Sequence, residues 1–91
     1  MTKPPCPTIH LNGTSKRALL DQLSAAYSEL SSASALLRVA MPHDRDYYPQ
    51  GDGAGHAARE HRSSQIEAVQ RVMRELEAEA ISIQAQPGRE D

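Results

Sequence analysis

The chain has 91 residues, lacks Phe and Trp, and carries a formal charge of −2 at neutral pH. This length allows one small domain with a modest core, and the lone cysteine, Cys6, excludes an internal disulfide and fits a reducing compartment. The negative charge disfavours general binding to duplex nucleic acid, and no run approaches the ~20 apolar residues of a membrane span. The N-terminus also lacks the apolar stretch of a signal peptide, so we expect a soluble, cytoplasmic protein.

The N-terminal region is punctuated by residues that break helices. Residues 1–8 contain three of the six prolines and predict a flexible tail. A short extended piece is predicted over Thr8-Ile9-His10-Leu11, which Asn12-Gly13 ends in a turn. We expect one domain over residues 9–84 and a second flexible tail at residues 85–91.

The first predicted helix spans residues 15–41. Thr14 and Ser15 are good N-caps, no Gly or Pro intervenes, and Pro42 ends the helix. Apolar residues recur at alternating intervals of four and three, as in a heptad seam. The seam residues are Leu19, Leu23, Ala26, Leu30, Ala33, Leu37 and Ala40, and the stripe is widened by Leu20, Tyr27 and Met41.

A second helix is predicted over residues 53–84, with Asp52 as its cap. Its seam can lie against the first when the helices run antiparallel, with Leu30 beside Ile66. We therefore predict an all-α, antiparallel two-helix hairpin, and its small core predicts assembly into a homo-oligomeric bundle. The second seam comprises Ile66, Val69, Met73, Leu76, Ala80 and Ile83.

The link between the helices and the ends that flank it concentrate arginine, tyrosine and histidine. Guanidinium groups bind phosphate and tyrosines stack on bases, so this region is the predicted binding site. The plainer alternative is that the tyrosines and Pro49 pack the link onto the helix ends while the charges pair or stay solvated. The candidate ligand-binding residues are Arg45, Tyr47, Tyr48, Gln50, His56, Arg59 and Arg62.

Other patterns give weaker indications. His56 and Glu60 share a helix face and could ligate a metal, but they match neither zinc-protease motif. The glycines at 51, 53 and 55 follow no evident strand, so they read as flexible turn residues rather than a phosphate-binding loop. No nucleophile lies beside a base in a recognisable motif, and the sequence therefore predicts a binding protein without catalytic residues, metal or cofactor.

Three strings resemble a group of small, uncharacterised proteins of tailed phages and prophages: residues 10–15, residues 58–61 and, most specifically, Arg45-Asp46-Tyr47-Tyr48-Pro49-Gln50-Gly51. The resemblance covers residues 9–80 and implies expression in the cytoplasm of a bacterial host. Small phage proteins without enzymatic motifs often counter host defence, which is an argument by analogy.

These considerations lead to three functional hypotheses. The leading one is a non-enzymatic counter-defence oligomer that sequesters a nucleotide-derived immune signal, such as a cyclic nucleotide or an ADP-ribose derivative, near the inter-helix link. The second is an inhibitor of a host defence protein, comparable to an anti-CRISPR, acting through the link or the acidic face of the second helix. The third is a structural or regulatory phage component.

Overall fold

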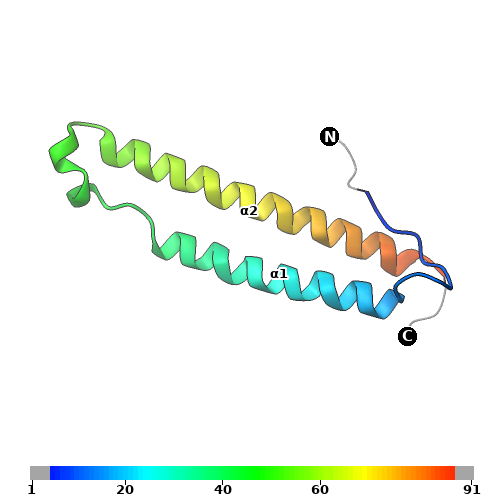
Figure 1. The fold of residues 1–91 in the computed structure, drawn as a ribbon. Coiled ribbons are helices and arrows are strands. Elements are labelled where there is room, and N and C mark those ends of the chain that lie inside the picture. The colour runs from blue at the N-terminus through cyan, green and yellow to red at the C-terminus, as the bar shows by residue number, and fades with distance from the viewer. Residues whose placement is uncertain (1–4, 88–91) are drawn as a thin grey trace.

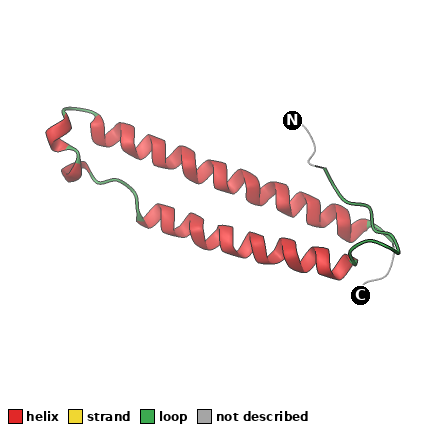
Figure 2. Cartoon of the chain, in the orientation of Figure 1, coloured by secondary structure: helices red, strands yellow, loops and turns green. Residues whose placement is uncertain are grey.

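The computed structural model describes residues 5–87, which form two α-helices, two short 3₁₀ helices and no strand. Helix α1 spans Lys16–Val39 and helix α2 spans Ala54–Ala85, with η1 (Asp44–Asp46) and η2 (Tyr48–Gln50) between them. The α-helices lie side by side and run antiparallel (Figures 1 and 2). The predicted all-α hairpin is confirmed, and the α-helices end within one or two residues of the expected positions.

The ends of the helices follow from local chemistry. Ser15 caps α1 as predicted, because its Oγ accepts a hydrogen bond from the N–H of Ala18 at 3.1 Å. The prediction that Asp52 caps α2 was wrong. Gly53 occupies the cap position with a φ of +84° and no side-chain cap bond, since this left-handed conformation favours glycine.

Gln86 joins three parts of the chain at the open end of the hairpin. Its backbone carbonyl accepts a hydrogen bond from Lys16 Nζ at 2.7 Å, its side-chain oxygen accepts one from the N–H of Ile9 at 2.9 Å, and its side-chain nitrogen donates to the carbonyl of Pro7 at 2.8 Å. The buried Lys16 ammonium thus lies at the C-terminal end of α2, where the helix dipole favours a cation. Of the tails expected at residues 1–8 and 85–91, residues 1–4 and 88–91 lie outside the described residues.

The predicted seam of α2 is confirmed. Ile66 and Ile83 are buried, and the four seam residues between them are partly buried against α1. Burying an isoleucine side chain contributes about 1.5–3 kcal/mol. Ile66 and Ile83 are also the only hydrophobic residues among those described that are buried to this degree, so the hairpin has a thin core.

The predicted seam of α1 was only half right. Leu23, Leu30 and Leu37 are partly buried, but the alanines assigned to the alternate row are exposed. The alternate row instead lies one residue further along, and its most buried member is Ser34, with 4% of its surface exposed. Ser34 is small enough to let α2 approach, and its Oγ accepts a hydrogen bond from Arg38 Nη1 at 3.2 Å. The covered residues of this row on α1 are Leu20, Ser34 and Met41, in place of Ala26, Ala33 and Ala40, and Tyr27 lies between them with 37% of its surface still exposed.

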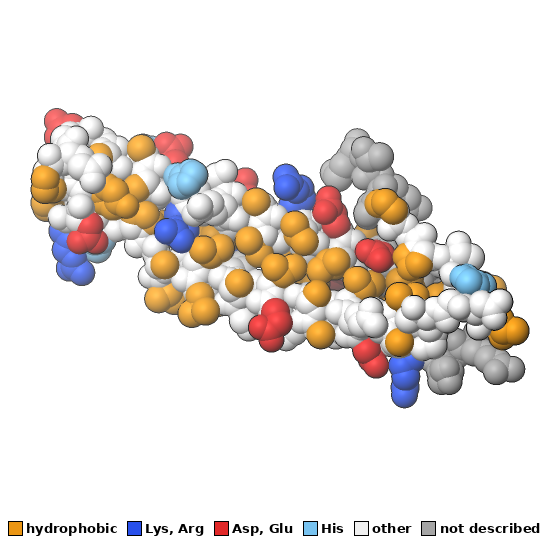
Figure 3. Space-filling model, in the orientation of Figure 1, with side chains coloured by type: hydrophobic (Ala, Val, Ile, Leu, Met, Phe, Trp, Pro, Cys, Tyr) orange, Lys and Arg blue, Asp and Glu red, His pale blue; other side chains and the backbone are white. Residues whose placement is uncertain are grey.

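The hairpin is elongated and leaves much apolar surface uncovered. Its Cα radius of gyration is 18.9 Å, against about 12 Å for a compact domain of this length. Figure 3 shows apolar side chains gathered along the junction of α1 and α2 on the face that it presents. Within residues 5–87, neither α-helix contains the unbroken apolar length that crossing a bilayer requires.

Candidate functional site

The hinge, which we define as residues 40–53, is folded by short-range hydrogen bonds into two consecutive turns. His43 begins η1, because its Nδ1 accepts a hydrogen bond from the N–H of Arg45 at 3.2 Å. The N–H of Tyr47 donates to the carbonyl of Asp44, and the N–H of Gln50 donates to the carbonyl of Tyr47, both at 2.9 Å. The hinge therefore forms an ordered cap on the hairpin rather than an open loop.

Asp44 attaches the hinge to α2 through two contacts. Its carboxylate forms an ion pair with the Arg59 guanidinium. Its main chain also approaches Gly55 so closely that a Cβ at that position would lie 3.2 Å from Asp44 Cα. The negative carboxylate thus lies beside the first turn of α2, where the helix dipole favours an anion.

The surroundings of Asp44 lower the pKa of its carboxyl group. The main cause is the hydrogen bond from Arg59, and the charges of Arg59, His43 and His56 lower the pKa further, while partial desolvation opposes them. Asp44 is therefore ionised at neutral pH. In turn, its charge offsets the positive charge of Arg59.

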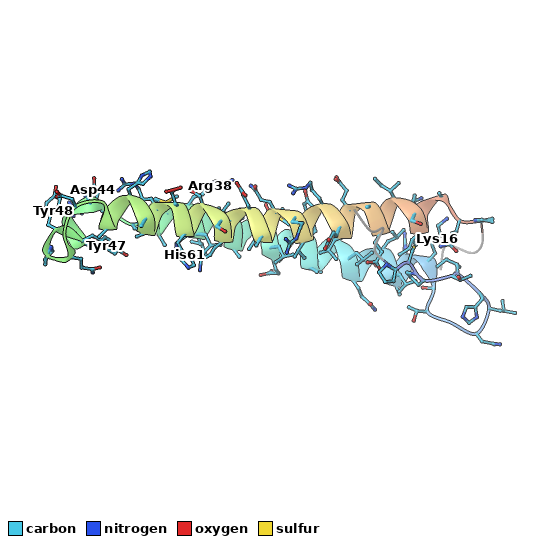
Figure 4. All side chains as sticks on the ribbon, turned by 90° about the horizontal axis from the view of Figure 1, so that it is seen from above. Lys16, Arg38, Asp44, Tyr47, Tyr48 and His61 are labelled. Carbon is cyan, nitrogen blue, oxygen red and sulfur yellow. The ribbon has the colours of Figure 1, made fainter. Side chains whose placement is uncertain are left out.

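A hollow of about 320 Å³, the hinge hollow, opens between the turns of the hinge and the first turns of α2. Its volume falls at the lower end of the range for small-molecule sites. Figure 4 shows Asp44, Tyr47 and Tyr48 together at this end of the molecule, with Arg38 and His61 further along the helices and Lys16 at the opposite end. The lining comprises Asp44, Tyr47, Tyr48, Gly51, Asp52, Gly53, Gly55, His56 and Arg59.

The lining combines aromatic faces with hydrogen-bond acceptors. Tyr47 is half-buried and Tyr48 is exposed, so each leaves ring surface on which a planar group can stack. Asp44 and Asp52 supply carboxylate oxygens, and their two formal negative charges exceed the single positive charge of Arg59. The hollow is therefore suited to a planar group that donates hydrogen bonds, rather than to a bare phosphate.

Four of the seven predicted ligand-binding residues line this hollow: Tyr47, Tyr48, His56 and Arg59. The imidazole Nε2 of His56 lies 2.9 Å from the Glu60 carboxylate, and both side chains are well exposed. This pair has the shared helix face predicted for them, but residues 5–87 contain no group of three or more His, Cys, Asp or Glu side chains placed to hold a metal ion.

The other three predicted residues lie outside the lining. Arg45 is exposed in η1, and Gln50 is exposed at the end of η2. Arg62 is half-buried on α2, one turn beyond the hollow, and its Nε is buried without a hydrogen-bond partner in the described structure. Thus the structure gathers the aromatic part of the predicted site and separates from it two of the three arginines.

Sequence reasoning missed the two aspartates and misread Gly55. Neither Asp44 nor Asp52 was among the predicted ligand-binding residues, and Gly55 was interpreted only as a flexible turn residue. Instead Gly55 is buried within α2. One signal was available, because Gly55 and Arg59 are four residues apart and so share a helix face on which another segment can pack.

Comparison with known proteins adds no assignment to this site. No protein-family model, curated protein or solved structure matches this chain.

Proposed function

We propose that this chain is a non-enzymatic binding protein that holds a nucleotide-derived small molecule in the hinge hollow. The observation that carries the proposal is the meeting of Tyr47 and Tyr48 with the carboxylates of Asp44 and Asp52 around one cavity. Aromatic faces stack on bases, at about 1–3 kcal/mol per base. Carboxylate oxygens accept hydrogen bonds from the amino and imino groups of a base.

The charge of the lining determines the orientation in which such a ligand enters the hinge hollow. Asp44 already offsets the charge of Arg59, so a phosphate placed deep in the hollow meets a net negative surface. The base therefore enters first, and the phosphates remain toward the solvent. Arg45, exposed in the adjoining turn, is the nearest cation along the chain that is free of the ion pairs described.

The biological setting in this proposal is phage counter-defence. Its support is the resemblance of the Arg45–Gly51 string to small proteins of tailed phages and prophages. In that setting the ligand is a nucleotide signal of bacterial immunity, which the protein sequesters in the host cytoplasm. We further propose that the chain self-associates, because a hairpin with so thin a core gains stability by covering its apolar junction.

Tyrosine fluorescence and calorimetry test the ligand proposal. The chain has no tryptophan, and two of its three tyrosines line the hollow, so a stacked base should quench the intrinsic emission. We expect a cyclic dinucleotide, a cyclic trinucleotide or an ADP-ribose derivative to bind with micromolar or tighter affinity. Tyr48→Ala should weaken that binding at least about fivefold, the factor that corresponds to the loss of about 1 kcal/mol from one stacked base.

A matched pair of histidine variants provides the control. His56 lines the hollow, whereas His61 is exposed on the same helix and outside the lining. His56→Ala should weaken binding and His61→Ala should leave it unchanged. The proposal is wrong if none of these ligands binds at micromolar concentrations, or if the two histidine variants behave alike.

A protein-directed inhibitor is the second candidate, favoured by apolar side chains near the hinge. Leu36 and Val39 expose 67% and 82% of their surface on the last turns of α1, and exposed apolar side chains of this kind mark protein interfaces when they are contiguous. This candidate predicts that Val39→Asp abolishes capture of a stoichiometric host partner. It also predicts that nucleotide titrations give no heat with the wild-type chain.

A further inference from the structure

An apolar groove lies between the two helices, away from the hinge. It has a volume of about 210 Å³. Tyr27 rims it with 37% of its surface exposed, and the leucines in it are only partly buried. Glu77 is its one charged residue. The groove is lined by Leu20, Leu23, Ser24, Tyr27, Leu76, Glu77 and Ala80.

The accessible area of the chain indicates how much surface is left to cover. The chain exposes 6802 Å², whereas a compact monomer of 10.0 kDa exposes about 5,200 Å². The excess of about 1,600 Å² is roughly twice the ~800 Å² that each partner buries in an interface of standard size. The elongated chain therefore exposes more additional surface than one partner covers in an interface of standard size.

We infer that the groove is the docking face for a second copy of this chain, giving an antiparallel four-helix bundle. This inference rests on the self-association proposed above, and it assigns that association to the face of the hairpin that contains the groove. Tyr27 lines the groove itself, so a two-fold axis that passes beside Tyr27 would place each tyrosine ring over the groove of the other copy. The apolar lining suits the leucine- and alanine-rich helices of an identical chain better than a charged partner.

Sedimentation equilibrium of paired variants tests the assignment. Tyr27→Glu places a charge in the groove and should lower the assembly from at least twice the chain mass toward the 10.0 kDa of one chain. Ala33→Glu is the control, because Ala33 is exposed on the same helix but outside the groove lining. It should leave the assembly mass unchanged, and circular dichroism should show equal helicity for both variants.

A failure of the groove assignment can be distinguished from a failure of the proposed self-association. A wild-type chain that sediments as a monomer contradicts self-association itself. An assembly that survives Tyr27→Glu but dissociates with Ala33→Glu contradicts the groove assignment alone. If Tyr27→Glu loses helicity, Ser24→Arg replaces it, since Ser24 is exposed at the groove; survival of the assembly in that variant overturns the assignment. Nucleotide binding is scored separately, by the His56 and His61 pair.

Discussion

Asp44 occupies the space that a side chain at Gly55 would need, so the hinge can close onto α2 only because residue 55 is glycine. A Cβ built at Gly55 would meet the Asp44 carboxylate and lie 3.2 Å from its Cα. The same carboxylate is paired with Arg59 one turn further along α2. This contact positions Tyr47 and Tyr48 over the start of α2 and so shapes the hinge hollow.

Gly55→Ala is expected to destabilise the protein, although replacing a helical glycine with alanine usually stabilises it by about 0.5–1 kcal/mol. The added methyl group overpacks the contact with Asp44, at a cost of about 1–3 kcal/mol. Urea unfolding followed by circular dichroism measures the change. The matched test is the same substitution in an Asp44→Ala background, where the cost should shrink. A Gly55→Ala protein more stable than the wild type would contradict the contact.

The Asp44–Arg59 ion pair predicts a dependence of stability on pH. Because the folded-state pKa of Asp44 is lowered, its contribution is fully present above the unfolded value near 4. That contribution is lost as the pH falls through the lower folded-state pKa. Asp44→Asn should therefore flatten the fall of the urea midpoint between about pH 5 and pH 2. Asp46→Asn is the control, because Asp46 has no ion-pair partner among the described residues. The prediction would be contradicted if the urea midpoints of the wild type and of Asp44→Asn fell equally steeply with decreasing pH.

Lys16 is expected to stabilise the open end of the hairpin. Lys16→Met keeps the apolar stem but removes the hydrogen bond to the Gln86 carbonyl, and bonds of this charged kind contribute about 1.5–3 kcal/mol. We expect a lower free energy of unfolding by about that amount. Arg17→Met, at the exposed neighbouring position, should change it by less than about 0.5 kcal/mol. A similar response of the two variants would show that the bond contributes little.

Two isoleucines near the end of α2 allow a test of the core. Ile83 is fully buried, whereas Ile81 exposes 64% of its surface. Ile83→Ala should lower the free energy of unfolding by about 2–5 kcal/mol, and Ile81→Ala should change it by less than about 0.5 kcal/mol. Denaturant titrations of both variants measure the difference. The assigned face of α2 would be wrong if Ile81→Ala proved the more damaging.

Local sequence patterns were sufficient for the two helices, the Ser15 cap and the apolar face of α2. These features depend on neighbouring residues, on helix-breaking prolines and on a strong contrast between isoleucine and glutamate along α2. On α1 the contrast is weak, because alanines and serines alternate beside the leucines. Hydropathy favoured Ala33 for the second row, whereas Ser34 is the residue that α2 covers.

The position of one helix around another, and the closure of the hinge, were decided only by long-range packing. The side chains of α2 determine which small residue of α1 faces that helix. The hydropathy of α1 alone does not contain this information. The contact between Asp44 and Gly55 likewise joins residues eleven positions apart. The two 3₁₀ helices between them were not predicted by the pattern of apolar residues. The distance between two residues on either side of a turn depends on the whole path of the backbone between them, whereas the hydrogen bonds of a helix join residues only four positions apart.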